Sequence, residues 1–187
     1  MKEFFEGYAH DLSRMLGAID TDQLAKIAEI VNTARIEGAK LLFMGNGGSS
    51  ATASHSAADW TKELGIKGFC LTDNVHLVTA ISNDISYDKI FEKQLEYLLA
   101  KGDIVLAYSG SGNSRNVING VSYAKKHANF TIGMTGDYNG NGGGELARIA
   151  DLAFVVPTKS MERIEDGHLI VNHVIKQYIK HSFLHLA

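Results

Sequence analysis

The sequence predicts an α/β fold: a three-layer doubly wound sandwich with a five-stranded parallel sheet, preceded by two N-terminal helices. Two observations support this class. From Lys40 onward, short apolar runs alternate with segments of helical periodicity. Loops rich in glycine join several of these runs to the helical segments, and the chain has 19 glycines but one proline. In such a sheet, right-handed crossovers place ligands at the carboxyl ends of the strands.

Two helices are predicted before the sheet. Within residues 1–18, apolar side chains recur at near-helical spacing, which indicates the first helix. Asp20 or Thr21 can cap the second helix, and Gly38 stands near its end, where a left-handed residue commonly terminates a helix. Both helices carry apolar stripes, so we expect the N-terminal helices, residues 1–38, to contribute to oligomerisation.

The remaining elements alternate along the chain. Apolar runs predict strands at residues 41–44, 68–72, 103–109, 130–135 and 152–157. Helical periodicity predicts helices at residues 50–64, 75–82 and 87–99, one that ends at Lys126, and one that Ser160 caps and that reaches Leu186. Residues 137–144 are expected to form a glycine-rich loop. Neither a repeat nor a linker interrupts this pattern, so residues 1–187 are predicted to form a single domain.

Composition excludes several classes of partner. Hydrophobic residues make up 45% of the chain, which is enough for a core without disulfides. A net charge of −3 gives no general attraction to nucleic acid or to an anionic membrane. The single cysteine, Cys70, cannot form an internal disulfide, and we find neither a signal peptide nor an apolar run long enough for a membrane span. We therefore expect a cytoplasmic protein.

Two glycine- and serine-rich loops, residues 45–50 and 109–114, are candidate phosphate sites. Each loop directly follows a predicted buried strand and precedes a predicted helix, whose N-terminus offers free N–H groups and partial positive charge. Small residues let backbone amides surround a phosphate dianion. Further donors are the hydroxyl groups of Ser49, Ser50, Ser109, Ser111 and Ser114. Neither loop contains lysine, so neither is a P-loop.

Two other interpretations of these loops stay open at this point. Each loop can be a tight turn between strand and helix, although two serine-bearing turns in one sheet weaken that interpretation. Alternatively, Gly45-x-Gly47-x-x-Ser50 is an incomplete dinucleotide-binding fingerprint, with Asp73 where a ribose-binding carboxylate belongs. A dinucleotide site leaves the second serine loop without a role.

Four motifs stand in order within residues 40–173: FMGNGGSSATASHSAADW, SNDISYDKIF, YSGSGNSRNV and ERIEDGHLIVNH. Together they resemble the bacterial phosphoheptose isomerases, which are SIS (sugar isomerase) domain proteins with a flavodoxin-like sheet. The resemblance implies a homotetramer with active sites between subunits and a sugar phosphate as small-molecule partner. It also implies conversion of sedoheptulose 7-phosphate to D-glycero-D-manno-heptose 7-phosphate by aldose–ketose isomerisation.

The same resemblance assigns roles to individual positions. The phosphate-binding positions it implies are Gly47, Gly48, Ser49, Ser109, Gly110, Ser111 and Ser114. The positions that line the sugar are Asn46 and Asp84. The zinc-binding positions are His55, Asp59, Glu165 and His173, of which Asp59, Glu165 and His173 are also the catalytic candidates.

Several of these positions depart from the family pattern. Asp59 stands where the family has a longer glutamate, Glu165 where it has glutamine, and Gly110 where it has threonine. The arginine that usually follows the first helix of the sheet domain is also replaced, with Lys62 and Glu63 nearby. These departures concern the sugar end of the site, and with it the choice of sugar.

The residue types suit an isomerase that works through an enediol. A base must remove a proton beside a carbonyl, and an acid or a metal must stabilise charge on oxygen. His55 and Asp59 lie four apart on a predicted helix and share one face, and Glu165 and His173 lie within ~80° of each other on the last helix. Two carboxylates facing each other would favour a bound cation, so we predict dependence on a divalent metal. Either Asp59 or Glu165 can be the base.

A non-catalytic alternative belongs to the same family. Some SIS proteins bind a sugar phosphate as regulators or act as protein scaffolds, and they need no acid–base residues. The presence of His55, His173 and two carboxylates favours the enzyme. Three other histidines, His168, His181 and His185, are interpreted as structural.

Overall fold

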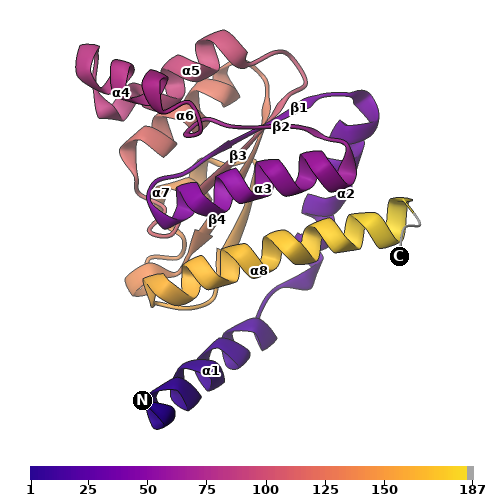
Figure 1. Ribbon diagram of the computed structural model, residues 1–187, viewed down its shortest axis with the longest axis vertical. Helices are drawn as coiled ribbons and strands as arrows, with labels where there is room; N and C mark the ends of the chain where they lie inside the picture. Colours follow the sequence, from indigo (N-terminus) through magenta and orange to yellow (C-terminus); the bar gives the residue numbers. More distant parts are fainter. Residues whose placement is uncertain (185–187) are drawn as a thin grey trace.

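The computed structural model describes residues 1–184, and its centre is one parallel sheet (Figure 1). The five strands are β1 (Lys40–Met44), β2 (Lys67–Cys70), β3 (Ile104–Ser109), β4 (Phe130–Gly136) and β5 (Leu152–Val156). They pair in the order β2-β1-β3-β4-β5, and every pairing is parallel. The predicted five-stranded parallel sheet is therefore confirmed.

Helices precede the sheet and connect its strands. They are α1 (Lys2–Gly17), α2 (Thr21–Glu37), α3 (Gly48–Leu64), α4 (Val75–Asp84), α5 (Ile90–Leu98), α6 (Arg115–Lys126), α7 (Gly144–Ile149) and α8 (Met161–Ile179). Short 3-10 helices lie at η1 (Tyr87–Lys89) and η2 (Tyr138–Gly140), and a π-helical turn, η3, covers Lys180–Leu184. Across residues 1–184, no helix combines the length and the apolarity that a membrane span requires.

The helices cover both faces of the sheet, as a doubly wound sandwich requires. Leu41 and Phe43 of β1 point into a core shared with α2, α3 and α8. Leu42 and Met44 of the same strand point into a second core, which includes residues of α4, α5, α6 and α7. This alternation follows from the two-residue period of a strand, and it explains why β1 is an unbroken apolar run.

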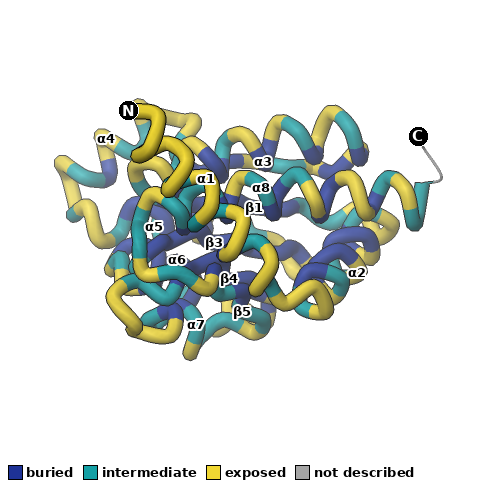
Figure 2. Tube along the Cα trace, turned by 90° about the horizontal axis from the view of Figure 1, so that it is seen from below, coloured by how far each residue is buried: buried dark blue, intermediate teal, exposed yellow. Residues whose placement is uncertain are grey.

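The first helix, α1, lies apart from the sandwich at one end of the molecule (Figure 1). Most of its residues are exposed (Figure 2). Met15 is its one buried residue. Phe4 and Phe5 are 74% and 68% exposed. Tyr8 attaches the helix to α8, because its hydroxyl donates to Asp166 and the Arg163 guanidinium stacks 3.8 Å over its ring. Of the apolar stripe expected for subunit contacts, Phe4 and Phe5 are thus open in the single chain, whereas Leu12, Met15 and Leu16 pack against the core.

Several local predictions need adjustment. The glycine-rich stretch 137–144 contains η2 and leads into α7, a helix that the sequence analysis did not assign. The predicted helix 87–99 divides into η1 and α5, and β2 ends at Cys70, two residues earlier than predicted. Ser160 precedes α8 as expected, but its hydroxyl donates to Glu162 instead of capping a backbone amide. The predicted end at Leu186 and His185 lie outside the described residues.

Candidate active site

The two serine-rich loops lie side by side at the carboxyl edge of the sheet. They follow β1 and β3, which are neighbours, and the chain then turns to opposite faces, into α3 and α6. This position is the topological switch point of the sheet, where open α/β folds bind ligands. The sequence placed both loops at strand ends, and the strand order now makes them adjacent.

A pair of asparagines joins the two loops. The side-chain amide of Asn46 donates to Asn116 Oδ1 at 2.8 Å, and the amide of Asn116 donates back to Asn46 Oδ1 at 2.9 Å. The Tyr87 hydroxyl donates to the same Asn46 oxygen at 2.8 Å. Sequence reasoning named Asn46 but missed Asn116 and Tyr87, although both stand inside the motifs that carried the family resemblance. Asp84, also predicted for the sugar site, is exposed at the end of α4 and accepts from Asn83.

The loop of residues 109–114 is held in one conformation. Ser109 Oγ donates to Ser114 Oγ at 3.3 Å, and the backbone N–H of Asn113 donates to Ser111 Oγ at 3.3 Å. Gly112 has φ +67°, and a Cβ there would lie 1.9 Å from the Gly143 carbonyl oxygen, so no other residue fits. Hydrogen bonds and close packing against Gly143 therefore hold the loop in place.

Packing explains one departure from the family pattern. A Cβ at Gly110 would lie 2.4 Å from Met161 Sδ and 3.5 Å from the Ile164 side chain. In this chain, Met161 fills the space that a longer residue at position 110 would need.

The serines of the first loop are largely enclosed. Ser49 is 6% exposed, and Ser50 Oγ lies 2.6 Å from Thr72 Oγ1 at the end of β2. Ser50 is therefore engaged within the chain.

Helices α3 and α8 run parallel, and their residues meet in sequence order along one groove. Both helices follow parallel strands, and they lie side by side on the same face of the sheet (Figure 1). From the N-terminal ends of the helices, the contacting pairs are Gly48 with Glu165, His55 with His173, Asp59 with Lys176, and Glu63 with Lys180. Each pair therefore occupies its own level along the helix axes, counted from the N-terminal ends of α3 and α8.

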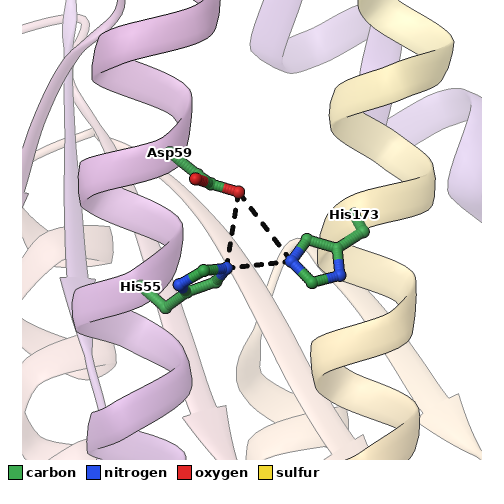
Figure 3. A group of neighbouring side chains, drawn as sticks. All are labelled: His55, Asp59 and His173. Carbon is green, nitrogen blue, oxygen red and sulfur yellow. Dashed lines mark hydrogen bonds and ion pairs between the residues drawn. The ribbon is translucent and has the colours of Figure 1, made fainter.

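Three predicted metal ligands come together in the middle of this groove (Figure 3). His55 and Asp59 project from α3 toward His173 on α8. The Nε2 atoms of the two histidines lie 2.8 Å apart, and Asp59 Oδ2 lies 3.4 Å from His55 Nε2 and 3.8 Å from His173 Nε2. We call His55, Asp59 and His173 the histidine–aspartate cluster.

The donor set of this cluster suits a divalent cation. Tetrahedral bonds of about 2.0–2.2 Å separate ligand atoms by roughly 3.3–3.6 Å, and the three observed separations bracket this range. Two imidazoles with one carboxylate are a common protein ligand set for zinc, and they leave a coordination position open. Both imidazoles are partly exposed, at 45% and 41% of the side chain. The residues present therefore fit a metal.

Glu165 does not join this cluster within the chain. Its carboxyl group lies over the start of α3, where a Cβ added at Gly48 would approach it to 2.5 Å. The sequence predicts that Glu165 lies near His173, because the two residues face one side of α8. However, eight residues of helix also separate them by about 12 Å along the axis. Within the single chain, Asp59 and Glu165 therefore do not face each other, contrary to the prediction.

Lys176 is the partner of Asp59 that sequence reasoning missed. Its Nζ donates to Asp59 Oδ2 at 2.7 Å and to Glu63 Oε1 at 2.8 Å, and the residue is 7% exposed. Burial acts to lower the pKa of Lys176, but its bonds to the two carboxylates outweigh burial and raise it. The bonds from Lys176 and Lys180 lower the pKa of Glu63 to about 2. The sequence contains a signal for this contact, because Lys176 follows His173 by three residues and so lies on the same face of α8.

Behind the groove, His168 is buried in the core, as its structural interpretation required. Its Nε2 lies 3.1 Å from the Thr135 carbonyl oxygen, and its ring packs edge-on against Tyr108. Burial lowers the pKa of His168 to about 4, so it is neutral at pH 7. Its Nδ1 has no partner among residues 1–184. His181, which was also interpreted as a structural core histidine, is exposed in η3, so that interpretation is wrong for His181.

Comparison with known proteins gives one consistent picture. The family model for the SIS domain matches residues 4–136. A phosphoheptose isomerase of Aliarcobacter butzleri (strain RM4018) is 38% identical over 169 residues, which cover 88% of this chain and 87% of that protein. A phosphoheptose isomerase of Sulfurimonas denitrificans is 40% identical over 146 residues, which cover 75% and 73%. The structure of phosphoheptose isomerase GmhA from Neisseria gonorrhoeae superimposes with a TM-score of 0.90 at 30% identity, covering 96% of this chain and 98% of that one.

Proposed function

This chain belongs to the SIS domain family, and we propose that it is a phosphoheptose isomerase that converts sedoheptulose 7-phosphate to D-glycero-D-manno-heptose 7-phosphate. The observation that carries the proposal is the arrangement of the α3–α8 groove. Its N-terminal end opens at the two serine-rich loops, and its middle holds the histidine–aspartate cluster. The first part suits a phosphate and the second suits proton transfer beside a carbonyl.

We assign phosphate binding to the serine-rich loops. Backbone N–H groups at the start of α3 and α6 point toward the carboxyl edge of the sheet, and the helix dipoles favour a dianion there. Ser109, Ser111 and Ser114 add hydroxyl donors around this position. Asn46, held by Asn116 and Tyr87, is placed to bond sugar hydroxyls where the sugar leaves the loop.

Isomerisation requires a base, an acid and stabilisation of a charged oxygen. A carboxylate takes the proton from the carbon next to the carbonyl, which gives an enediol, and the proton returns to the neighbouring carbon. The imidazoles would act through the cation that they hold, and the proton on the enediol oxygen can exchange with water. A divalent cation, which we propose is zinc, would be held by His55, Asp59 and His173 and would supply positive charge for the enediolate oxygens.

We further propose a homotetramer with active sites between subunits. In the single chain the cluster is half-exposed, whereas proton transfer to an enediolate requires exclusion of water. Glu165 is also remote from the cluster within the chain, so an adjacent protomer is the natural source of a second carboxylate. The exposed apolar residues of α1 support a role of helices 1–38 in assembly. A location in the cytoplasm stays a prediction from the sequence.

The alternatives are less well supported. A non-catalytic regulator or scaffold has no need of a histidine–aspartate cluster next to phosphate loops. The dinucleotide interpretation leaves the loop of residues 109–114 unused. The relatives that match most of the chain are phosphoheptose isomerases, which favours the enzyme over both alternatives.

The direct test is turnover of sedoheptulose 7-phosphate by purified protein supplied with zinc. We expect product formation, which NMR can monitor directly, and loss of activity after treatment with a chelator. A His173→Ala variant is the matched negative control. Saturable binding of the sugar phosphate without turnover would replace the isomerase by the non-catalytic alternative. Full activity of metal-free protein would remove zinc from the proposal.

A further inference from the structure

Lys176 is a buried cation in direct contact with the histidine–aspartate cluster. It follows His173 by three residues on α8, so its side chain enters the same groove. Its ammonium group donates to Asp59 Oδ2, the same oxygen atom that lies 3.4 Å and 3.8 Å from the two imidazole Nε2 atoms. One carboxylate oxygen is thus shared between the lysine and the position that would bind a metal.

Lys176 makes a second ion pair, with Glu63, in addition to its bond to Asp59. Its Nζ also donates to Glu63 Oε1, and Lys180 donates to Glu63 Oε2 at 3.0 Å. Asp59 and Glu63 are one turn apart on α3, and Lys176 and Lys180 are one turn apart on α8, so the four charges alternate along the groove. With an exposure of 7%, Lys176 has little freedom to leave this arrangement.

A carboxylate oxygen bound by an ammonium group is a weaker metal ligand than a free one. Part of its negative charge is already neutralised, and the ammonium group repels a second cation placed a few ångströms away. The same bond also fixes the short Asp59 side chain at the height of the imidazoles, which a flexible free carboxylate would not keep. Lys176 therefore both orients the ligand and opposes the charge of the metal.

We propose that Lys176 is a positioning residue that holds Asp59 against the histidine pair and lowers the affinity of the cluster for divalent cations. The cation is then held weakly enough to exchange, in contrast to a structural zinc. The inference rests on the proposed function only in treating the cluster as a cation site.

The experiment measures zinc binding to the metal-stripped, full-length protein by competition with a chromophoric chelator. Lys176→Met removes the charge and keeps the length of the side chain, and we expect it to bind zinc about tenfold more tightly or better. Lys176→Arg keeps the charge and should stay within about threefold of the parent. Lys180→Met, which loses only a contact to Glu63, is the matched control and should also stay near the parent. Circular dichroism verifies folding, and Lys176→Gln replaces Lys176→Met if the latter does not fold.

The outcomes separate this inference from the proposed isomerase. Unchanged or weaker zinc binding by the folded Lys176→Met variant overturns the role of Lys176. A Lys176→Arg variant that binds zinc as tightly as Lys176→Met also overturns it. Absence of zinc binding by every variant overturns it as well. Turnover of sedoheptulose 7-phosphate by the parent is a separate measurement. It can succeed while the lysine variants show no difference, or fail while they differ as expected.

Discussion

Asp59 and Glu165 are two carboxylates in contrasting surroundings. Asp59 has 21% of its side chain exposed, accepts a bond from Lys176 and faces two imidazoles. The Glu165 carboxyl group lies over Gly48 at the start of α3, next to the loops assigned to the phosphate. Asp59 lies within the histidine–aspartate cluster and is held there by Lys176, so we assign Asp59 to the cation and Glu165 to proton transfer.

Two substitutions distinguish these roles. Glu165→Gln should lower turnover by ~10²–10⁴-fold while zinc binding by the folded protein is retained, because the amide cannot accept the proton. Asp59→Asn should instead weaken zinc binding, and added zinc should recover part of its turnover. The measurements are steady-state kinetics and zinc titration of both variants. Glu162→Gln, at an exposed acid of the same helix, is the control.

The assignment would be reversed by a specific pattern. If Asp59→Asn kept its zinc and lost turnover, while Glu165→Gln remained active, Asp59 would be the base. The family resemblance alone left both possibilities open, since both residues depart from the family pattern. The contact with Lys176 is what separates them.

At the scale of elements, α8 joins the groove to the core of the sheet. One face presents Glu165, His173 and Lys176 to α3, and another buries His168 against the carbonyl of Thr135 on β4. Burial holds the pKa of His168 at about 4, against 6.5 for the unperturbed side chain. The position of α8 therefore depends on an imidazole that must stay neutral.

This burial makes stability depend on pH. Because the folded pKa of His168 is lowered, the unfolded chain takes up the proton first as the pH falls, and unfolding becomes easier. The contribution is complete above about pH 6.5 and is lost as the pH falls toward 4. Between pH 7 and pH 5, we expect His168 to account for a loss of about 2 kcal/mol in the free energy of unfolding.

Urea unfolding at the two pH values tests this expectation. His168→Gln can still donate to the Thr135 carbonyl but does not titrate, so its stability should change less between pH 7 and pH 5. His127→Gln, at an exposed histidine, should keep the dependence of the parent. An equal loss of stability in the parent and in His168→Gln would show that other groups cause the acid sensitivity.

At the scale of the whole molecule, two features of the single chain are exposed that a neighbouring protomer would cover. The two imidazoles of the histidine–aspartate cluster are almost half-exposed, and Phe4 and Phe5 of α1 are exposed to solvent. Figure 2 shows that most of α1 is exposed. About 12 Å of helix separates Glu165 from His173, although both are assigned to the same reaction. The proposed sharing of a site between protomers would account for both the exposure and the separation.

Mixed assemblies test a shared site. His55→Ala and Glu165→Gln should each be nearly inactive alone. If each active site takes its cluster from one protomer and Glu165 from another, random mixing in equal amounts rebuilds about a quarter of the sites. Co-expression, purification with two affinity tags and an activity assay measure this recovery. Mixed assemblies that form but remain inactive would show that each site is built within one chain.

The sequence by itself determined the local features of this protein. The strand–helix alternation, the two serine-rich loops at strand ends and the placement of His55 and Asp59 on one helical face were all predictable. They depend on periodicity and turn chemistry within a few residues. The α7 helix was missed because its glycine-rich start, with positive φ at residues 142–144, has the composition of a loop.

Only the tertiary structure decided which side chains meet across the α3–α8 groove. His173 meets His55, Lys176 meets Asp59, and Glu165 reaches Gly48 instead of the cluster. These pairs are separated by more than 100 residues, and their alignment is set by how both helices pack on the sheet. Local sequence patterns give the face of a helix, but the height at which two helices meet depends on the packing of the whole core.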